Sequence, residues 1–249
     1  GKRVVEIGCG QGDMTTVLAS LVWDRGGKGG EVHALDPADL DKYGSPFTLA
    51  QAQSHISSTV LGERISWRNV DPLEYLSSEG IGGFDYAVLA HSIYYLPSLG
   101  YLYELFRALH RNVNVGKLLV AEWSNEISDL KSLPHLLSVL IQGLKPLEEG
   151  NVRISPSPSC IVRLATKAGW KLVEQEQGGG GGGGGSKKRG HLGRILKSPQ
   201  VEDGKWEVFS ALEVAKSLAD LDDQEGPEEG GTSGIKNVKS MDVWTAVFV

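Results

Sequence analysis

The stretch at residues 4–13 decides the fold, and it reads VVEIGCGQGD. An apolar run from Val4 to Ile7 leads into Gly8, Gly10 and Gly12, after which a helical pattern begins. An apolar run that ends in alternate glycines predicts a strand, a tight turn and a helix. Glycine lets the backbone bend sharply and approach a ligand closely, where a Cβ atom would collide with it. The stretch therefore predicts a loop that binds a nucleoside.

The loop departs from the dinucleotide fingerprint. That fingerprint, G-x-G-x-x-G, needs a third glycine at position 13, where this chain has Asp13. A carboxylate just inside the helix would also repel a pyrophosphate drawn to the positive end of the helix dipole. We therefore expect a ligand that carries positive charge and no phosphate.

The glycines and the acid before them form the pattern E-x-G-x-G-x-G, with Glu6, Gly8, Gly10 and Gly12 in its fixed positions. This pattern resembles motif I of the class I S-adenosylmethionine-dependent methyltransferases, which have a Rossmann-like domain. The resemblance implies that the cofactor is S-adenosylmethionine, whose sulfonium carries positive charge. It also implies that the loop, with Cys9 in it, contacts this cofactor. A structural alternative for Glu6 is that it ties down the loop by accepting backbone amides.

Two further acids extend the resemblance. Residues 31–37 read EVHALDP, a second strand that ends in Asp36 and Pro37. In the family such an acid binds the ribose hydroxyls, and one carboxylate can accept both of them. A third strand, 65–70, precedes Asp71 and Pro72, where family members often place an acid for the adenine amino group. Taken singly, a glycine-rich turn or an Asp-Pro pair occurs in many α/β proteins.

The hydrophobic pattern predicts an α/β fold. Apolar runs alternate with amphipathic helical patterns up to about residue 125, which is typical of a parallel sheet covered on both faces. The five expected strands are 3–7, 32–35, 65–70, 84–90 and 117–123. The resemblance implies that 170–174 and 241–249 add an antiparallel hairpin. We therefore predict a Rossmann-like three-layer α/β/α sandwich whose seven-stranded sheet is mostly parallel with an antiparallel last strand.

Helices are expected between these strands. Ser45 and Pro46 predict a helix cap and first turn, with Gly62 closing that helix after about Val60. Apolar residues after Pro97 repeat at helical spacing and predict a helix before the fifth strand. Further helices are expected over 130–147 and 159–168.

We interpret residues 1–249 as a single methyltransferase domain. Residues 1–125 form the cofactor-binding core, and 126–177 with 238–249 form the C-terminal part of the fold. Between them, 178–237 is a glycine-rich insertion that opens with eight glycines, 178–185, and is expected to be flexible with a short helix over 211–221. Because the first strand begins at once, we expect the chain to be a fragment that lacks the N-terminal helices that commonly cover the cofactor in the family. The alternative is that later segments build this cover.

Composition narrows the partners. The chain has 25 Lys and Arg against 31 Asp and Glu, a net charge of -6, which argues against a basic face for nucleic acid or an anionic membrane. Two cysteines, Cys9 and Cys160, form no disulfide framework and no paired metal-ligand spacing. No apolar stretch approaches ~20 residues. We expect a cytoplasmic protein that binds a small-molecule methyl acceptor and no nucleic acid or membrane, in an oligomeric state that the sequence leaves open.

The segment after the fourth strand is the candidate for chemistry. Residues 91–97 read HSIYYLP and lack the Asn or Asp, two prolines and aromatic of enzymes that methylate a base or amide nitrogen. His91 is the candidate catalytic base, since an imidazole titrates near ~6.5 and can take a proton at neutral pH. The alternative is that His91 contacts the cofactor or holds the loop. Tyr94, Tyr95 and Trp123 are candidate acceptor contacts, with packing as the alternative.

No metal site is expected, because the acids near Asp36 have solvated and ribose-binding explanations. Three hypotheses on function remain. The first is a methyltransferase that acts on a nucleophilic O, N or C of a small molecule. The second is a protein methyltransferase, and the third is a cofactor-binding protein of this family that no longer transfers methyl groups.

Overall fold

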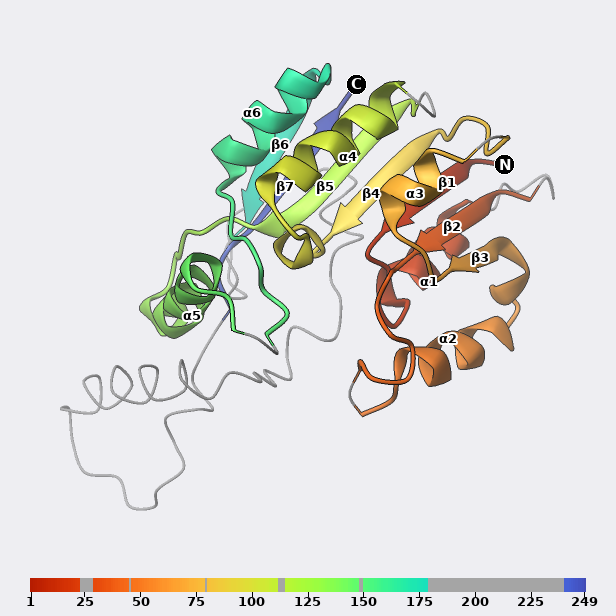
Figure 1. The fold of residues 1–249 in the computed structure, drawn as a ribbon, viewed down its shortest axis with the longest axis horizontal. Coiled ribbons are helices and arrows are strands. Elements are labelled where there is room, and N and C mark those ends of the chain that lie inside the picture. Colours follow the sequence, from red (N-terminus) through yellow and green to blue (C-terminus); the bar gives the residue numbers. More distant parts are fainter. Residues whose placement is uncertain (23–28, 45, 79, 112–114, 148–149, 179–239) are drawn as a thin grey trace.

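The computed structural model describes residues 1–249 except 23–28, 45, 79, 112–114, 148–149 and 179–239. Its centre is a seven-stranded sheet, shown with the chain ends in Figure 1. The strands are β1 (Arg3–Ile7), β2 (Glu31–Leu35), β3 (Ile65–Arg68), β4 (Tyr86–Ala90), β5 (Lys117–Trp123), β6 (Leu172–Gly178) and β7 (Val243–Phe248). The predicted fold class is confirmed.

The strand order is β3-β2-β1-β4-β5-β7-β6. Neighbouring strands from β3 to β5 are parallel, and β7 runs antiparallel to both β5 and β6. The central strand β1 pairs through Val5 with His33 of β2 on one side and Ala87 of β4 on the other. The chain thus builds outward from β1 in one direction and then returns to build in the other. The reversal between β1 and β4 is the place where open α/β sheets bind their ligands.

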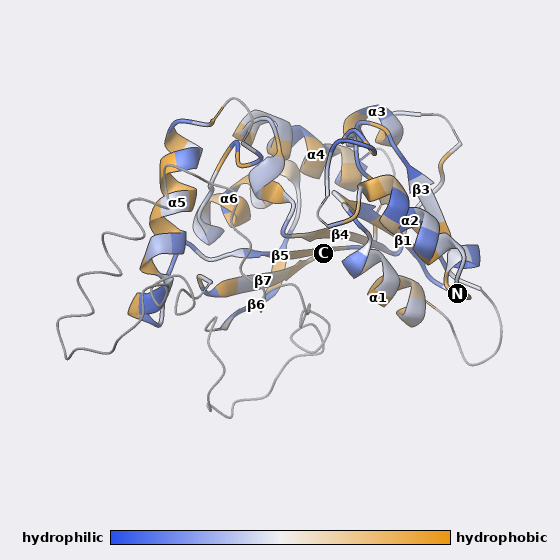
Figure 2. Ribbon diagram, turned by 90° about the horizontal axis from the view of Figure 1, so that it is seen from below, coloured by the Kyte–Doolittle hydropathy of each residue, from blue (hydrophilic) through white to orange (hydrophobic). Residues whose placement is uncertain are grey.

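Helices cover both faces of the sheet. The α-helices are α1 (Asp13–Leu21), α2 (Leu49–Ser57), α3 (Pro72–Leu76), α4 (Leu99–Arg111), α5 (Leu133–Leu144) and α6 (Pro158–Ala168), and the 3-10 turns are η1 (Gly62–Arg64), η2 (Ile93–Tyr95) and η3 (Leu130–Ser132). In Figure 2, α3, α4 and α6 lie on one side of the sheet and α1 on the other. The sheet is therefore the middle layer of three.

The two faces of the strands belong to two hydrophobic clusters. In β1, Val5 and Ile7 join the larger cluster, which includes Phe106 of α4. Val4 points the opposite way and packs with Leu18 of α1 in the smaller cluster. This alternation is the period-two pattern of a strand buried on both faces. It also fixes where Glu6 points, because that side chain shares the α1 side with Val4.

The helix α2 is shorter than predicted. It begins after Thr48, whose Oγ1 accepts the N–H of Gln51 at 3.2 Å, while the Gln51 side chain accepts the N–H of Thr48 at 3.0 Å. This reciprocal capping box starts the helix at Leu49, and Gly62 opens η1 instead of closing α2. The predicted start near Pro46 was therefore wrong, and Ser45 lies outside the described residues.

The C-terminal elements follow the prediction with shifted ends. The helix expected over 130–147 is a 3-10 turn followed by α5, which has Pro134 in its first turn. The α6 helix is capped by Ser157 and ended by Gly169 at φ 114°. Trp170 is part of that helix end, since its N–H bonds to Ala165 and its indole N–H to Phe106, so β6 begins two residues later than predicted. The insertion predicted over 178–237 lies outside the described residues from 179 onward.

The longest of the described helices is α4, with 13 residues. At 1.5 Å per residue it is about 20 Å long, short of the ~30 Å hydrocarbon core of a bilayer. Among the described ranges, no helix is long and apolar enough to cross a membrane.

Candidate functional site

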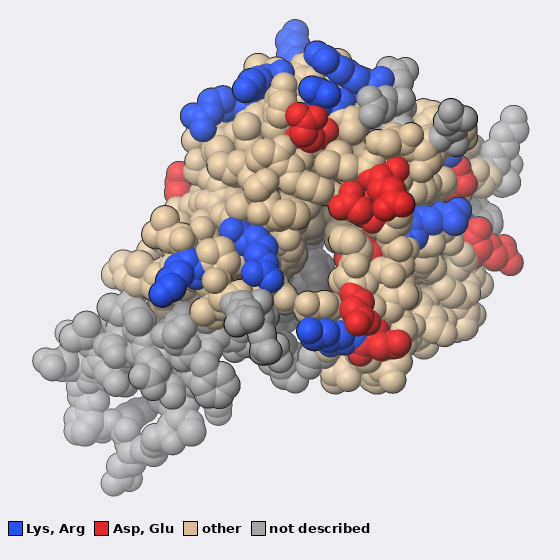
Figure 3. Space-filling view, viewed as in Figure 1, with Lys and Arg blue, Asp and Glu red and all other residues tan. Residues whose placement is uncertain are grey.

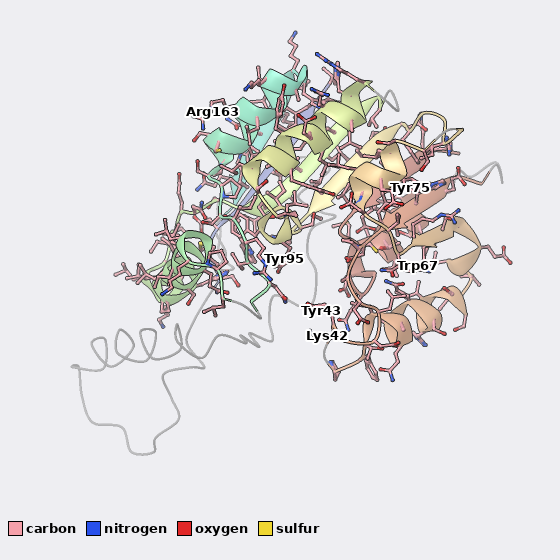
Figure 4. The ribbon with its side chains drawn as sticks, in the orientation of Figure 1. Lys42, Tyr43, Trp67, Tyr75, Tyr95 and Arg163 are labelled. Carbon is pink, nitrogen blue, oxygen red and sulfur yellow. The ribbon has the colours of Figure 1, made fainter. Side chains whose placement is uncertain are left out.

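The candidate site lies at the carboxyl ends of β1 and β4. Figure 3 shows the surface hollowed near this edge of the sheet. Figure 4, in the same orientation, places Tyr95 of η2 on one side of this region and Tyr43 of the β2–α2 loop on the other. Both tyrosines are exposed, at 54% and 39%. The hollow is therefore next to the two loops that the sequence pattern singled out.

The glycine loop adopts the backbone that its sequence predicts. Gly8, Gly10 and Gly12 have φ of 76°, 51° and 98°, values at which other residues are strained. A Cβ atom at Gly8 would lie 2.5 Å from Cβ of Ser92, and one at Gly12 would lie 2.6 Å from the ring of Trp67. A Cβ atom at Gly10 would have nothing within 4 Å. Gly8 and Gly12 are thus needed for packing, whereas Gly10 has open space beside it for a ligand.

Asp36 lies against this loop. Its Oδ2 accepts the N–H of Gly10 at 2.8 Å, and its Oδ1 accepts the N–H of Ala38 at 2.9 Å. Gln53 of α2 donates to the carbonyl of Gly10 at 2.9 Å. The carboxylate predicted for the ribose therefore orients the open glycine, with capacity for further donors on both oxygens.

Glu6 is buried beneath the loop. Its side chain is 2% exposed and accepts a 2.6 Å hydrogen bond from Thr15 of α1. Burial raises the pKa of Glu6 to about 8, and the charges of Asp36 and Asp13 add to the rise. The charges of Asp36 and Asp13 near the glycine loop give the site a negative potential, which favours a cation and disfavours a pyrophosphate.

Glu6→Gln is expected to flatten the pH dependence of stability. In the wild type the folded pKa of Glu6 is raised from 4.5 to about 8, so the folded state favours the protonated carboxyl. That contribution is fully present below pH ~4.5 and is lost as the pH rises to ~8, on the order of a few kcal/mol. The amide keeps an acceptor for Thr15 and does not titrate. Urea unfolding at pH 5.5 and pH 8.5 measures the difference, which should be larger in the wild type than in the variant.

The other predicted cofactor residues have structural contacts of their own. Asp71 caps α3 through Oδ1, which accepts the N–H of Leu73 at 2.8 Å, and its Oδ2 accepts the hydroxyl of Tyr101 at 2.9 Å. Pro72 is buried in the first turn of that helix, whereas Pro37 is exposed. Cys9 is buried, which raises the pKa of its thiol strongly. A contact of Asp71 with adenine stays a prediction. In the structure its carboxylate caps α3 and binds Tyr101.

The end of β4 contacts the loop directly. His91 has φ 52°, unusual for a residue other than glycine, and its backbone N–H donates to Ala121 at 2.8 Å. Ser92 is 3% exposed and packs on Gly8. Its buried hydroxyl has no hydrogen-bond partner among the described residues. A buried hydroxyl without a partner beside a glycine loop fits a site that a polar ligand completes.

The predicted acceptor contacts differ in their exposure. Tyr94 is 2% exposed and its hydroxyl donates to Asn125 at 2.6 Å, so its ring belongs to the core in this arrangement. Tyr95 is exposed beside the hollow. Trp123 lies between two histidines, with its ring centre 4.5 Å from that of His91 and 4.9 Å from that of His135. Of the three, Tyr95 lies at the open surface and Trp123 lies against His91.

His135→Asn is expected to stabilise the protein toward acid relative to the wild type. Burial lowers the pKa of His135 from 6.5 to about 3, and its Nδ1 accepts the N–H of Met241 at 3.0 Å. The neutral ring contributes stability that is present above pH ~6.5 and lost as the pH falls toward ~3. An Asn carbonyl can accept the same N–H without titrating. Thermal unfolding at pH 7.5 and 4.5 checks whether the melting temperature falls less in the variant.

Several residues at this site were not predicted from the sequence. They include Thr15, Gln53, Ser92, Tyr101 and Glu122. Only Glu122 carries a sequence signal, because a carboxylate near the end of a mostly apolar strand needs partners if it is buried. The others are ordinary polar residues whose positions become significant only in three dimensions.

Comparisons with known proteins find similarity to methyltransferases. No protein-family model matches the chain. Two curated proteins, the methyltransferases phomM' and phomM of Diaporthe leptostromiformis, are each 26% identical over 211 residues, covering 70% of this chain and 54% of theirs. The chain thus spans about half the length of the curated relatives it matches.

Solved structures of similar proteins share the fold of this chain. A cyclopropane-fatty-acyl-phospholipid synthase-like protein from Lactobacillus casei is 26% identical with a TM-score of 0.70, covering 100% of this chain and 84% of that one. A SAM-dependent methyltransferase from Methanosarcina mazei shares the fold, with a TM-score of 0.52 at 11% identity, over 99% of this chain and 91% of that one. The predicted resemblance to class I S-adenosylmethionine-dependent methyltransferases is therefore confirmed.

Proposed function

We propose that this chain, which resembles class I S-adenosylmethionine-dependent methyltransferases in sequence and fold, binds S-adenosylmethionine and transfers its methyl group to a nucleophilic O, N or C of a small molecule. The methyltransferase part of the proposal is supported by the similar proteins, which are methyltransferases by name. The nature of the acceptor and the cytoplasmic location are our inferences. Two proposals compete with this one: a methyltransferase that acts on protein, and a protein that binds the cofactor without transferring its methyl group.

One observation carries the cofactor assignment. Gly10 is held at φ 51° by a hydrogen bond from its N–H to Asp36, and open space lies where its Cβ would be. A dinucleotide loop would meet its pyrophosphate with amides and the positive end of a helix. Here the charges of Asp36 and Asp13 lie near the loop, which suits a ligand with a sulfonium and an ammonium group.

The residues that would hold the cofactor follow from these contacts. Asp36 has acceptor capacity for the ribose hydroxyls, and Gly10 allows close approach of the ligand. Ser92 offers a hydroxyl beside Gly8. When bound, S-adenosylmethionine supplies an activated methyl group, so the protein's task is to align the acceptor and, for a protonated acceptor, to remove its proton.

A small acceptor is favoured by the surface near the hollow. Tyr95 and Tyr43 are exposed in this region and offer aromatic faces to an apolar or aromatic molecule. The net charge of -6 disfavours nucleic acid as the substrate. These features favour a small-molecule acceptor over a nucleic acid.

Methyl transfer itself tests the proposal. The purified chain is incubated with S-adenosylmethionine labelled in its methyl group and either a library of small alcohols, phenols and amines or a protein extract. Label in a small product together with S-adenosylhomocysteine supports the proposal. Label only in protein favours the protein methyltransferase, and cofactor binding without transfer to either pool favours the silent protein.

A further inference from the structure

A buried carboxylate lies at the end of β5, where the sequence pattern assigned no function. Glu122 is 1% exposed. Its Oε2 accepts the N–H of Ile93 at 3.0 Å and its Oε1 accepts the N–H of Trp123 at 3.0 Å. These bonds hold the carboxylate between the end of β5 and the turn η2, which follows β4. A carboxylate in such a place is costly unless it is paired with a donor or a positive charge.

His91 supplies the adjacent group. Its Nδ1 lies 3.5 Å from Oε1 of Glu122 and is buried without a hydrogen-bond partner among the described residues. The side chain is 30% exposed, so the open part of the ring is the edge away from Nδ1, where Nε2 lies. The ring rests on Trp123. One ring nitrogen thus faces a buried acid and the other faces outward.

The backbone holds His91 in this position. A left-handed conformation is strained in a residue other than glycine and persists only where surrounding contacts impose it. Here the N–H of His91 bonds to Ala121 of β5, and the next residue packs on Gly8 of the glycine loop. The imidazole is therefore placed between the candidate cofactor loop and the end of β5.

The titratable side chains near His91 are less suited to act as a base. His135 accepts the N–H of Met241 at Nδ1, so its proton is on Nε2, and its lowered pKa keeps it neutral. The hydroxyl of Tyr94 donates to Asn125, and burial and the charge of Glu122 raise its pKa, so it is a poor base. The pKa of Tyr95 is raised by burial and by the charge of Glu122, so this hydroxyl is a poor base as well. Among these groups, His91 is the one suited to accept a proton.

We propose that Glu122 is a positioning residue that keeps a proton on Nδ1 of His91, so that Nε2 is free to act as the base toward an acceptor that must lose a proton. This inference rests on the proposed function and narrows its acceptor to an alcohol, a phenol or an ammonium nitrogen. The acceptor's X–H bond breaks with its proton going to Nε2, and the freed electron pair forms the X–CH3 bond. The electron pair of the S–CH3 bond remains on sulfur, giving neutral S-adenosylhomocysteine. The imidazolium then faces Glu122.

The tautomer of His91 tests this proposal without any acceptor. The ring nitrogens of 15N-labelled protein are observed by long-range 1H–15N NMR at pH 8, in the wild type, Glu122→Gln and Glu126→Gln. Glu126 is an exposed acid after the same strand, so its variant controls for the loss of one charge. His135 is an internal reference, because its contact with Met241 places its proton on the other nitrogen.

The expected result is a proton on Nδ1 of His91 in the wild type and in Glu126→Gln, with mixed or reversed tautomers in Glu122→Gln. A proton on Nε2 of His91 in the wild type contradicts the proposal, and so does an unchanged tautomer in a folded Glu122→Gln. If that variant fails to fold, the wild-type tautomer decides alone. Titration of the same samples with S-adenosylhomocysteine is separate: absent binding with the expected tautomer contradicts the proposed function and not the His91–Glu122 arrangement.

Once an acceptor is known, Glu122→Gln should lower kcat by roughly tenfold or more with an alcohol or ammonium acceptor, up to the roughly 10²–10⁴-fold that general-base catalysis contributes in full. The kcat with an acceptor that is already ionised should be unchanged. Equal losses with both acceptors would indicate a purely structural role and overturn the proposal.

Discussion

Asp36→Asn is expected to weaken binding of S-adenosylhomocysteine by roughly one to two orders of magnitude. A hydrogen bond to a charged group contributes about 1.5–3 kcal/mol, and the proposed ribose contact depends on this carboxylate. The amide also keeps only one acceptor oxygen, so it cannot serve Gly10, Ala38 and a ribose as the carboxylate does. Isothermal titration of wild type and variant gives the ratio of dissociation constants.

Asp39→Asn is the matched control for this prediction. Asp39 lies three residues further along the same loop and is exposed, and its side chain accepts the N–H of Asp41. The substitution removes the same charge from the same neighbourhood. Its affinity should stay within about threefold of the wild type, under 1 kcal/mol. An equal loss in both variants would show that the effect is general charge rather than a contact of Asp36.

Gly8→Ala is expected to lower mainly the stability of the protein, and Gly10→Ala mainly its affinity for the cofactor. Both place a side chain at positive φ, which costs about 1–2 kcal/mol. At Gly8 the new methyl would lie 2.5 Å from Cβ of Ser92, which adds an overpacking cost of about 1–3 kcal/mol. At Gly10 it would meet nothing within 4 Å and would enter the space that we assign to the ligand.

Two measurements on each variant separate these effects. Urea unfolding should show a larger loss of stability for Gly8→Ala, and titration with S-adenosylhomocysteine should show a loss of roughly tenfold or more in affinity for a folded Gly10→Ala. Unchanged affinity in Gly10→Ala would mean that the open space beside that glycine is not used by the ligand. Equal stability of the two variants would contradict the packing assigned to Gly8.

The fold could be predicted from the sequence because its signals are local. The apolar run at 3–7 and the glycines after it define β1 and the turn, and Gly169 ends α6 where its sequence indicates. The ends of elements were less predictable where two local signals compete. The capping box of Thr48 and Gln51 displaces the earlier helix start, and Trp170 stays with its helix because its indole bonds to α4.

The candidate site was predictable only in part. Glu6, Asp36 and the glycines are adjacent to strand ends, so topology alone brings them together. The contact between His91 and Glu122 joins residues 31 positions apart through the pairing of β4 with β5, a register that no local pattern specifies. The burial of Tyr94 beside the exposed Tyr95 depends likewise on the tight 3-10 turn η2, which places neighbouring rings in opposite environments.

The most direct test of the central claim is isothermal titration of the wild-type chain with S-adenosylmethionine, S-adenosylhomocysteine and NADH. We expect one site with a dissociation constant on the order of micromolar, about 8 kcal/mol, for the first two ligands and no measurable binding of NADH. Binding of NADH without either sulfur ligand would contradict the assignment of the glycine loop and of Asp36 to S-adenosylmethionine.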